Sequence, residues 1–177
     1  MLLDLNFARF SSRCAEVSSR SEVEIREKYI EGRAKRDFER GATTEKQFFA
    51  EMADWMQWPP ERIVELKYFW SDIFTEPPGA REAIEQFRAQ GRVWVLSDTD
   101  PAHIEFIRKR FPWSLDVERV FTSYERNKFK RDPQAFEEIV NEAGVPASEI
   151  LFLDDLQDNV DAAKAAGIDA RLFTGWD

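Results

Sequence analysis

The sequence has little cysteine and little histidine. Its single cysteine, Cys14, excludes an internal disulfide and favours a reducing compartment. Its single histidine, His103, follows Pro101 in a helical pattern, where we expect it to face solvent or cap the helix rather than act in catalysis. A site built on cysteine or histidine ligands is therefore not expected, and attention moves to carboxylates, lysines and hydroxyl groups.

Long apolar runs and excess positive charge are also missing. No run approaches the roughly 20 apolar residues that a membrane helix needs. The start of the chain has no basic-then-apolar signal pattern. Acidic residues exceed basic ones by 34 to 25, and the resulting net charge of −9 disfavours binding to nucleic acid or to an anionic membrane. We therefore expect a cytoplasmic protein that binds neither.

The composition that is present favours a packed globular protein with two regions. Hydrophobic residues make up 43% and aromatic residues 14% of the 177 residues, enough for one sizeable core. Pro77-Pro78-Gly79 marks a boundary. Before it, residues 1–76 have helical patterns rich in aromatic side chains, and we expect Thr43 to cap one of these helices. We expect the tryptophans of this region to pack in a core rather than bind a ligand.

After the boundary, residues 77–177 alternate short apolar runs with helical patterns. Such runs are typical of strands that are buried on both faces of a parallel sheet, and the helices between them provide the crossover connections. The sequence therefore predicts an α/β fold with a Rossmann-like, doubly wound parallel sheet and a small helical domain. The apolar runs lie at residues 93–96, 120–122, 150–153 and 170–173.

Polar side chains follow three of these runs. Ser97, Asp98 and Thr99 follow the first, Lys130 lies in the loop after the second, and Asp154-Asp155 follow the third. The carboxyl ends of parallel strands meet at one edge of the sheet, where open α/β folds bind ligands. Two adjacent carboxylates repel each other unless a cation compensates them, and Mg²⁺ is the usual one.

A hydroxyl group, a lysine and a metal-binding acid pair together suit phosphoryl chemistry. The hydroxyl binds phosphate oxygens, the lysine neutralises charge, and Mg²⁺ offsets the negative charge between phosphate and carboxylates. The alternative is that Asp154-Asp155 only cap the following helix and interact with its dipole. The presence of Ser97 and Lys130 at the same edge favours the metal site.

The three segments, in this order, resemble motifs of the haloacid dehalogenase superfamily. Leu96-Ser97-Asp98-Thr99 is similar to the second motif, usually Leu-Ser-Asn-Thr, with Asp98 adding a negative charge where the asparagine is usual. Lys130-Arg131-Asp132-Pro133 is similar to the third motif, Lys-Pro-Asp-Pro. Leu153-Asp154-Asp155 with Asn159 is similar to the fourth. Residues 1–76 stand where many members carry a helical cap, so the resemblance divides the chain into a cap, residues 1–76, and an α/β core, residues 77–177.

The resemblance implies a role for each motif residue. Ser97 and Thr99 would hold phosphate, with Asp98 beside them, and Lys130 would stabilise phosphate and the nucleophile. Asp155 would ligate Mg²⁺ with support from Asp154. The implied activity is a Mg²⁺-dependent phosphatase that acts on a small phosphorylated metabolite through an aspartyl-phosphate.

The first motif of the family, Asp-x-Asp, has no clear counterpart. Met1-Leu2-Leu3-Asp4-Leu5-Asn6-Phe7 resembles the segment that follows this motif, so we expect the nucleophile to lie upstream of residue 1 and Met1 not to be the true start. The alternative is that Asp4-Leu5-Asn6 is itself a degraded first motif. In this family the first strand lies between the strands of the second and fourth motifs. Without it the sheet would contain a slot with unpaired backbone groups, unless the sheet rearranges or chains exchange strands.

Two other functions stay open at this point. A noncatalytic relative would bind a phosphorylated ligand or a protein partner without turnover. A 2-haloacid dehalogenase is less favoured, because dehalogenases need no metal and the acid pair favours one.

Overall fold

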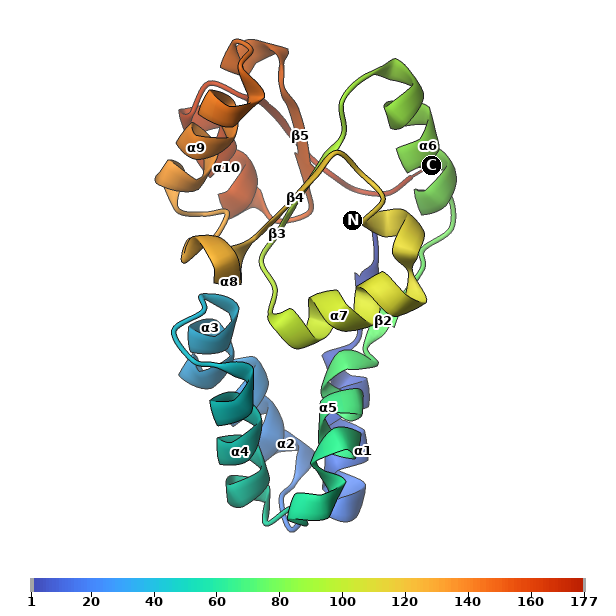
Figure 1. Cartoon of the computed structure of the whole chain (residues 1–177), viewed down its shortest axis with the longest axis vertical. Coiled ribbons are helices and arrows are strands. Elements are labelled where there is room, and N and C mark those ends of the chain that lie inside the picture. Colours follow the sequence, from blue (N-terminus) through green and yellow to red (C-terminus); the bar gives the residue numbers. More distant parts are fainter. Residues whose placement is uncertain (1, 177) are drawn as a thin grey trace.

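The computed structural model describes residues 2–176, apart from the side chain of Pro133. The first half of the chain forms a bundle of antiparallel helices, here called the helical region, in the lower half of Figure 1. An Asn6 side chain caps the first helix, and a π-helical turn, Arg26–Ile30, extends the second. The helices are α1 (Phe7–Val17), α2 (Glu22–Ile25), α3 (Arg33–Glu39), α4 (Glu45–Met56) and α5 (Ile63–Ser71).

The cap of α4 is Thr44, not Thr43 as the sequence predicted. Thr44 Oγ1 accepts a hydrogen bond from the backbone N–H of Gln47, and the Gln47 side chain accepts one from the backbone N–H of Thr44. This reciprocal pair needs a glutamine or glutamate three residues after the cap, which only Thr44 has.

The second half alternates helices and short strands in the upper half of Figure 1. A two-stranded antiparallel sheet connects the halves, formed by β1 (Asp4–Leu5) and β2 (Phe74–Thr75). The remaining helices are α6 (Ala80–Gln90), α7 (Pro101–Arg110), α8 (Ser123–Arg126), α9 (Pro133–Ala143) and α10 (Gln157–Ala165); the remaining strands are β3 (Trp94–Ser97), β4 (Arg119–Thr122), β5 (Leu151–Asp154) and β6 (Asp169–Leu172).

The predicted α/β fold is confirmed, but its parallel strands form two separate pairs. β3 pairs with β4 and β5 with β6, both in parallel, and no ladder joins β3 to β5 within residues 2–176. Each of these two strands therefore has one neighbour. Their apolar side chains are consequently more exposed than those of strands inside a continuous parallel sheet, with Leu151 at 46%.

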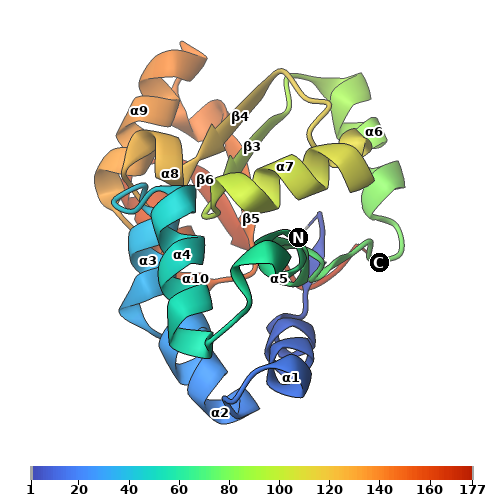
Figure 2. The same cartoon turned by 60° about the horizontal axis from the view of Figure 1, so that its bottom comes forward.

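The apolar side chains form two cores of unequal size. The larger core joins Phe10, Phe48 and Trp70 of the helical region to Ala102 and Ile107 of α7. Figure 2 shows α7 lying across the end of α5, against which it packs. Trp58 and Trp70 are buried in this core, as predicted for tryptophans of this region. The smaller core lies between α9, α10 and the β5–β6 pair and includes Phe136, Val160, Ala163 and Ala170.

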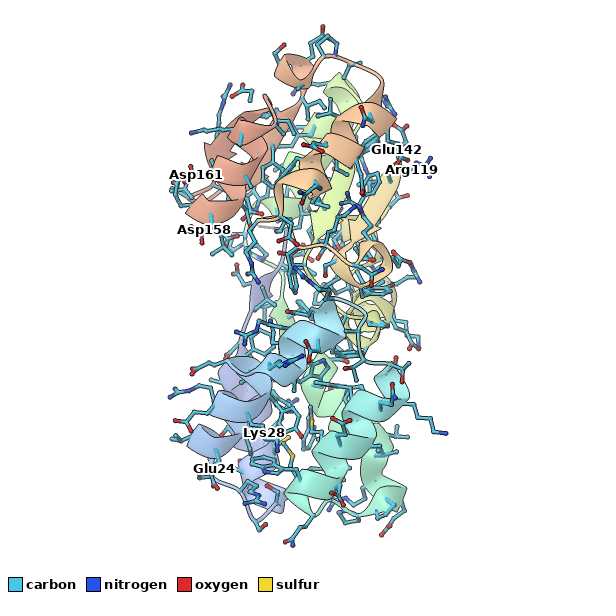
Figure 3. The ribbon with its side chains drawn as sticks, turned by 90° about the vertical axis from the view of Figure 1, so that its left-hand side faces the viewer. Glu24, Lys28, Arg119, Glu142, Asp158 and Asp161 are labelled. Carbon is cyan, nitrogen blue, oxygen red and sulfur yellow. The ribbon has the colours of Figure 1, made fainter. Side chains whose placement is uncertain are left out.

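The outside of the α/β half carries ion pairs and solvated acids. Figure 3 shows Arg119 of β4 beside Glu142 of α9, and their ion pair has an Nη2–Oε1 distance of 2.9 Å. Asp158 and Asp161 project outward from α10 and are exposed. None of the helices in the described part of the chain is long and apolar enough to span a membrane.

Candidate functional site

Lys130 connects the ends of the two strand pairs. Its backbone N–H donates to Asp98 Oδ1, immediately after β3, at 3.0 Å. Its side-chain Nζ reaches Asp154 Oδ2, the last residue of β5, at 2.6 Å. Both partners of this ion pair are buried, with 5% of Lys130 and 2% of Asp154 exposed. The structure therefore brings three of the residues predicted from sequence together.

The second oxygen of Asp154 is also held. Asp154 Oδ1 accepts hydrogen bonds from the Asn159 side-chain amide at 2.8 Å and from the backbone N–H of Leu156 at 3.0 Å. Asn159 is buried on the first turns of α10, so the turn after β5 and the helix itself both orient the carboxylate. Three donors to its two oxygens fix the carboxylate in one orientation.

The charges of Asp98, Lys130 and Asp154 interact. Burial raises the pKa of Asp98 above its ordinary value, and the nearby Asp154 carboxylate adds to this increase. The positive charge of Lys130 and the hydrogen bond from its backbone N–H oppose the increase without cancelling it. The sequence predicted that the side chain of Asp98 lies beside bound phosphate. In the structure, its hydrogen bond from the Lys130 N–H joins the loops that follow β3 and β4.

Ser97 and Thr99 lie near this ion pair in sequence but differ in their surroundings. Ser97 ends β3, is half-buried, and faces Thr122 of β4 across the strand pair. Thr99 is buried, and its backbone N–H donates to Ser123 Oγ at 2.9 Å. That amide is therefore already used within the protein, whereas the Ser97 hydroxyl lies at the strand edge where a ligand would bind.

The Asp155 carboxylate is the one that the sequence predicts as a metal ligand. It is exposed, follows the fixed Asp154 directly, and makes no hydrogen bond or ion pair with other described residues. Mg²⁺ commonly takes one or two protein carboxylates and completes its shell with waters and phosphate oxygens. Asp155 fits one such position. The described residues contain no cluster of three or more metal-ligating side chains, so this part of the chain alone does not enclose a metal.

Asp4, the weak candidate for the nucleophile, lies elsewhere. It is exposed in β1 and pairs with Thr75 of β2 in an antiparallel sheet, apart from β3 and β5. Asn6 accepts a hydrogen bond from the backbone N–H of Arg9 and thereby caps α1. The Asp4-Leu5-Asn6 segment consequently begins the helical region in this structure.

The expectation that His103 faces solvent is wrong, because only 2% of it is exposed. His103 Nδ1 lies 2.9 Å from Asp100 Oδ2, and Nε2 lies 3.0 Å from the backbone oxygen of Trp70. Trp70 Nε1 donates to Asp100 Oδ2 at 3.0 Å, and the Trp70 ring stacks on the His103 imidazole. Burial by itself would raise the pKa of Asp100, but His103 and these hydrogen bonds lower it below its ordinary value.

Sequence reasoning missed this cluster because its members are far apart in the chain. Trp70 lies in α5, whereas Asp100 caps α7 and His103 lies on its first turn. The one local signal was Asp100-Pro101, an N-cap followed by proline at the first helical position. The cluster joins the helical region to the α/β half and is not part of the Asp98–Lys130–Asp154 arrangement.

Comparison with known proteins gives two phosphatases as relatives over part of the chain. The enolase-phosphatase E1 of Enterobacter sp. (strain 638) is 30% identical over 92 residues, which are 51% of this chain and 40% of that protein. A phosphorylated carbohydrates phosphatase of Thermotoga maritima is 29% identical over 114 residues, which are 62% of this chain and 50% of that protein. The chain spans half or less of the length of these curated relatives.

A HAD family enzyme from Bacteroides thetaiotaomicron, solved in complex with magnesium and inorganic phosphate, has the same fold. It superposes with a TM-score of 0.85 at 22% identity, covering 97% of this chain and 88% of that chain. The family model described as haloacid dehalogenase-like hydrolase matches residues 6–167. This match extends over nearly the whole sequence and includes all three motifs at the strand ends. The chain therefore belongs to the haloacid dehalogenase-like hydrolases.

Proposed function

We propose that this protein is a Mg²⁺-dependent phosphatase acting on a small phosphorylated metabolite. The observation that carries the proposal is the buried Lys130–Asp154 pair beside the exposed Asp155 carboxylate, at the ends of parallel strands. Two relatives are named as phosphatases, and one structure of the same fold was solved with magnesium and phosphate.

The residues of this chain supply binding and charge compensation. The Lys130 ammonium has three N–H donors, and Asp154 takes one of them, so others can reach phosphate oxygens. The Ser97 hydroxyl donates to phosphate from the end of β3. Asp155, supported by Asp154, would hold Mg²⁺, which supplies further charge neutralisation at the phosphate when bound.

The nucleophile in this proposal is an aspartate on a strand between β3 and β5, supplied by residues outside this 177-residue chain. Its carboxylate oxygen forms a bond to phosphorus while the bond from phosphorus to the substrate oxygen breaks. The leaving oxygen takes a proton from the second aspartate of the Asp-x-Asp motif, which regains it from the water of the next step. Water then attacks the aspartyl-phosphate, releasing inorganic phosphate and restoring the carboxylate. The unpaired edges of β3 and β5 would accommodate such a strand.

The test expresses the gene with its upstream codons and measures p-nitrophenyl phosphate hydrolysis with and without Mg²⁺. We expect metal-dependent turnover that falls about 100-fold or more in Lys130→Met and Asp155→Asn. Asp158→Asn, a change of an exposed acid on α10, is the matched control and should retain activity. Activity that is independent of both Mg²⁺ and Lys130 would overturn the proposal.

A second candidate is phosphate binding without turnover, by this chain alone or with a protein partner. It is favoured by the position of Asp4, which places no aspartate of the first residues beside Lys130. In that case titration calorimetry would detect phosphate binding, and upstream codons would not restore hydrolysis. Metal-independent halide release from a 2-haloacid would instead support the dehalogenase alternative. Strand exchange between chains and a cytoplasmic location stay predictions.

A further inference from the structure

The end of α3 in the helical region is seated tightly on α8 of the α/β half. Ser123 Oγ donates to the backbone oxygen of Glu39 at 2.6 Å. Gly41 has a φ of +74°, and a Cβ atom added there would lie 2.3 Å from the backbone oxygen of Tyr124. This contact admits no side chain, so residues 39–41 are fixed against the helix that follows β4.

Between Glu39 and Gly41, Arg40 reaches the loop that carries Lys130. Arg40 Nη2 lies 2.6 Å from Asp132 Oδ2, and the guanidinium carbon lies 4.6 Å from the centre of the Phe129 ring. Both charged partners are partly exposed, so the ion pair by itself stabilises the protein little. Its importance is geometric, because it joins two regions 92 residues apart.

Asp132 uses the same oxygen to close a turn. Its Oδ2 atom also accepts a hydrogen bond from the backbone N–H of Phe129 at 3.0 Å. The backbone N–H of Asp132 donates to the Phe129 oxygen at 2.9 Å. Asp132 therefore holds both ends of the turn 129–132, and Arg40 fixes the carboxylate and packs on the ring at the other end of this turn.

Lys130 lies inside this turn. Its backbone N–H is bonded to Asp98 and its Nζ to Asp154, so the conformation of the turn decides where the ammonium stands. A change of the turn would shift both contacts together, because they belong to one residue.

We infer that Arg40 is a positioning residue for Lys130. Docking of the helical region places Arg40 against Asp132 and Phe129, and this contact holds the turn that presents the lysine. The helical region thus acts on the site through Arg40. The effect on catalysis rests on the proposed phosphatase function; the effect on the geometry of Lys130 does not.

The test measures how fast acetic anhydride labels the Lys130 amine, by mass spectrometry, in the full gene product. Buried, ion-paired Lys130 reacts slowly in the parent protein. In Arg40→Met we expect labelling about tenfold faster or more, because the turn opens locally. Arg40→Lys keeps the charge and part of the contact and should give an intermediate rate. Arg33→Met removes another arginine of α3, paired within its own helix to Asp37, and should leave the rate unchanged.

Cys14 provides the internal control for unfolding, because its thiol is fully buried in the larger core. If Lys130 labelling rises while Cys14 stays unreactive, the turn has opened in a folded protein, as the inference requires. If Lys130 labelling does not rise, or rises only together with Cys14, the inference is overturned.

Phosphatase assays on the same variants separate this inference from the proposed function. In an active parent enzyme, Arg40→Met should lower kcat more than it changes KM, because substrate binding keeps its other contacts. An inactive parent with faster Lys130 labelling in Arg40→Met would refute the phosphatase proposal and retain the positioning role. An active parent enzyme with unchanged Lys130 labelling in Arg40→Met would support the phosphatase proposal and refute the positioning role.

Discussion

Lys130 and Asp154 form the most deeply buried lysine–carboxylate pair among the described residues. Removing Lys130 leaves the buried Asp154 carboxylate without its counter-charge, although two hydrogen bonds to Oδ1 stay. We expect Lys130→Met to lower the free energy of unfolding by about 3–5 kcal/mol, the usual cost of breaking a buried ion pair. Urea denaturation measures this value. Lys164→Met on the exposed face of α10 is the control and should change stability by about 0.5 kcal/mol or less. A cost below about 1 kcal/mol for Lys130→Met would show that water compensates Asp154.

Whereas the Lys130–Asp154 pair stabilises the folded protein, ionisation of Asp98 destabilises it. Its pKa in the folded protein lies above the ordinary value of 3.8 owing to burial, so the unfolded chain releases this proton first as pH rises. The resulting loss of stability grows from about pH 4 up to the folded pKa and then stays constant. Asp98→Asn removes the charge and keeps an oxygen that can accept from the Lys130 N–H.

We therefore expect Asp98→Asn to raise Tm at pH 7, with a gain that shrinks as pH falls toward 4. Thermal unfolding of both proteins across this range tests the expectation. A gain that is equal at every pH would instead indicate a change in packing, and no gain at pH 7 would mean that Lys130 fully compensates the carboxylate.

At the scale of elements, the contact between the end of α3 and α8 depends on backbone approach rather than on side-chain charge. Gly41 and Gly144 both have positive φ values, of 74° and 68°, but only Gly41 meets another backbone atom. Gly144, after α9, has no atom within 4 Å of an added Cβ. A side chain at Gly144 would therefore meet only the penalty of the left-handed backbone conformation, whereas a side chain at Gly41 would also clash with backbone.

Gly144→Ala should cost about 1 kcal/mol, the penalty of the left-handed conformation alone. Gly41→Ala adds the clash with the Tyr124 oxygen, so we expect a cost of about 3 kcal/mol or more and a weaker contact between α3 and α8. Chemical denaturation gives both values. Equal costs would mean that the chain around Gly41 moves away without affecting stability.

At the scale of the whole molecule, the apolar side chains form two separate cores, and no strand ladder joins β3 to β5 within the described residues. The larger core joins the helical region to α7. The smaller core lies among α9, α10 and the β5–β6 pair, and Leu96 of β3 packs against it. Burial of apolar surface sets the stability of each unit, so the smaller core should open at a lower free energy.

Native-state hydrogen exchange tests this division. We expect slowly exchanging amides in α1, α4 and α5 and faster exchange in β5, α10 and β6. Supplying the upstream residues should slow exchange in β3 and β5 if they add the strand of the proposed function. Uniform protection throughout the chain would show that the two cores unfold as one unit.

The sequence by itself determined the α/β fold class, the four strands after residue 77 and the three polar segments at strand ends, but not the short strands β1 and β2. These features depend on local patterns: apolar runs, helix caps and proline or glycine at boundaries. The same patterns predicted that Asp98, Lys130 and Asp154 lie at one edge, because parallel strands align their carboxyl ends. The division at residue 77 into a cap and a core stays a prediction, since the larger core contains side chains from both sides of it.

Only the tertiary structure decided which partner each side chain takes. Lys130 pairs with Asp154 rather than standing free, Asp98 binds a backbone N–H, and His103 is buried against Trp70 and Asp100. Arg40 reaches Asp132 across 92 residues of sequence. None of these contacts follows from periodicity or spacing, because each depends on how separate elements dock, and docking is governed by packing of distant surfaces rather than by local propensity.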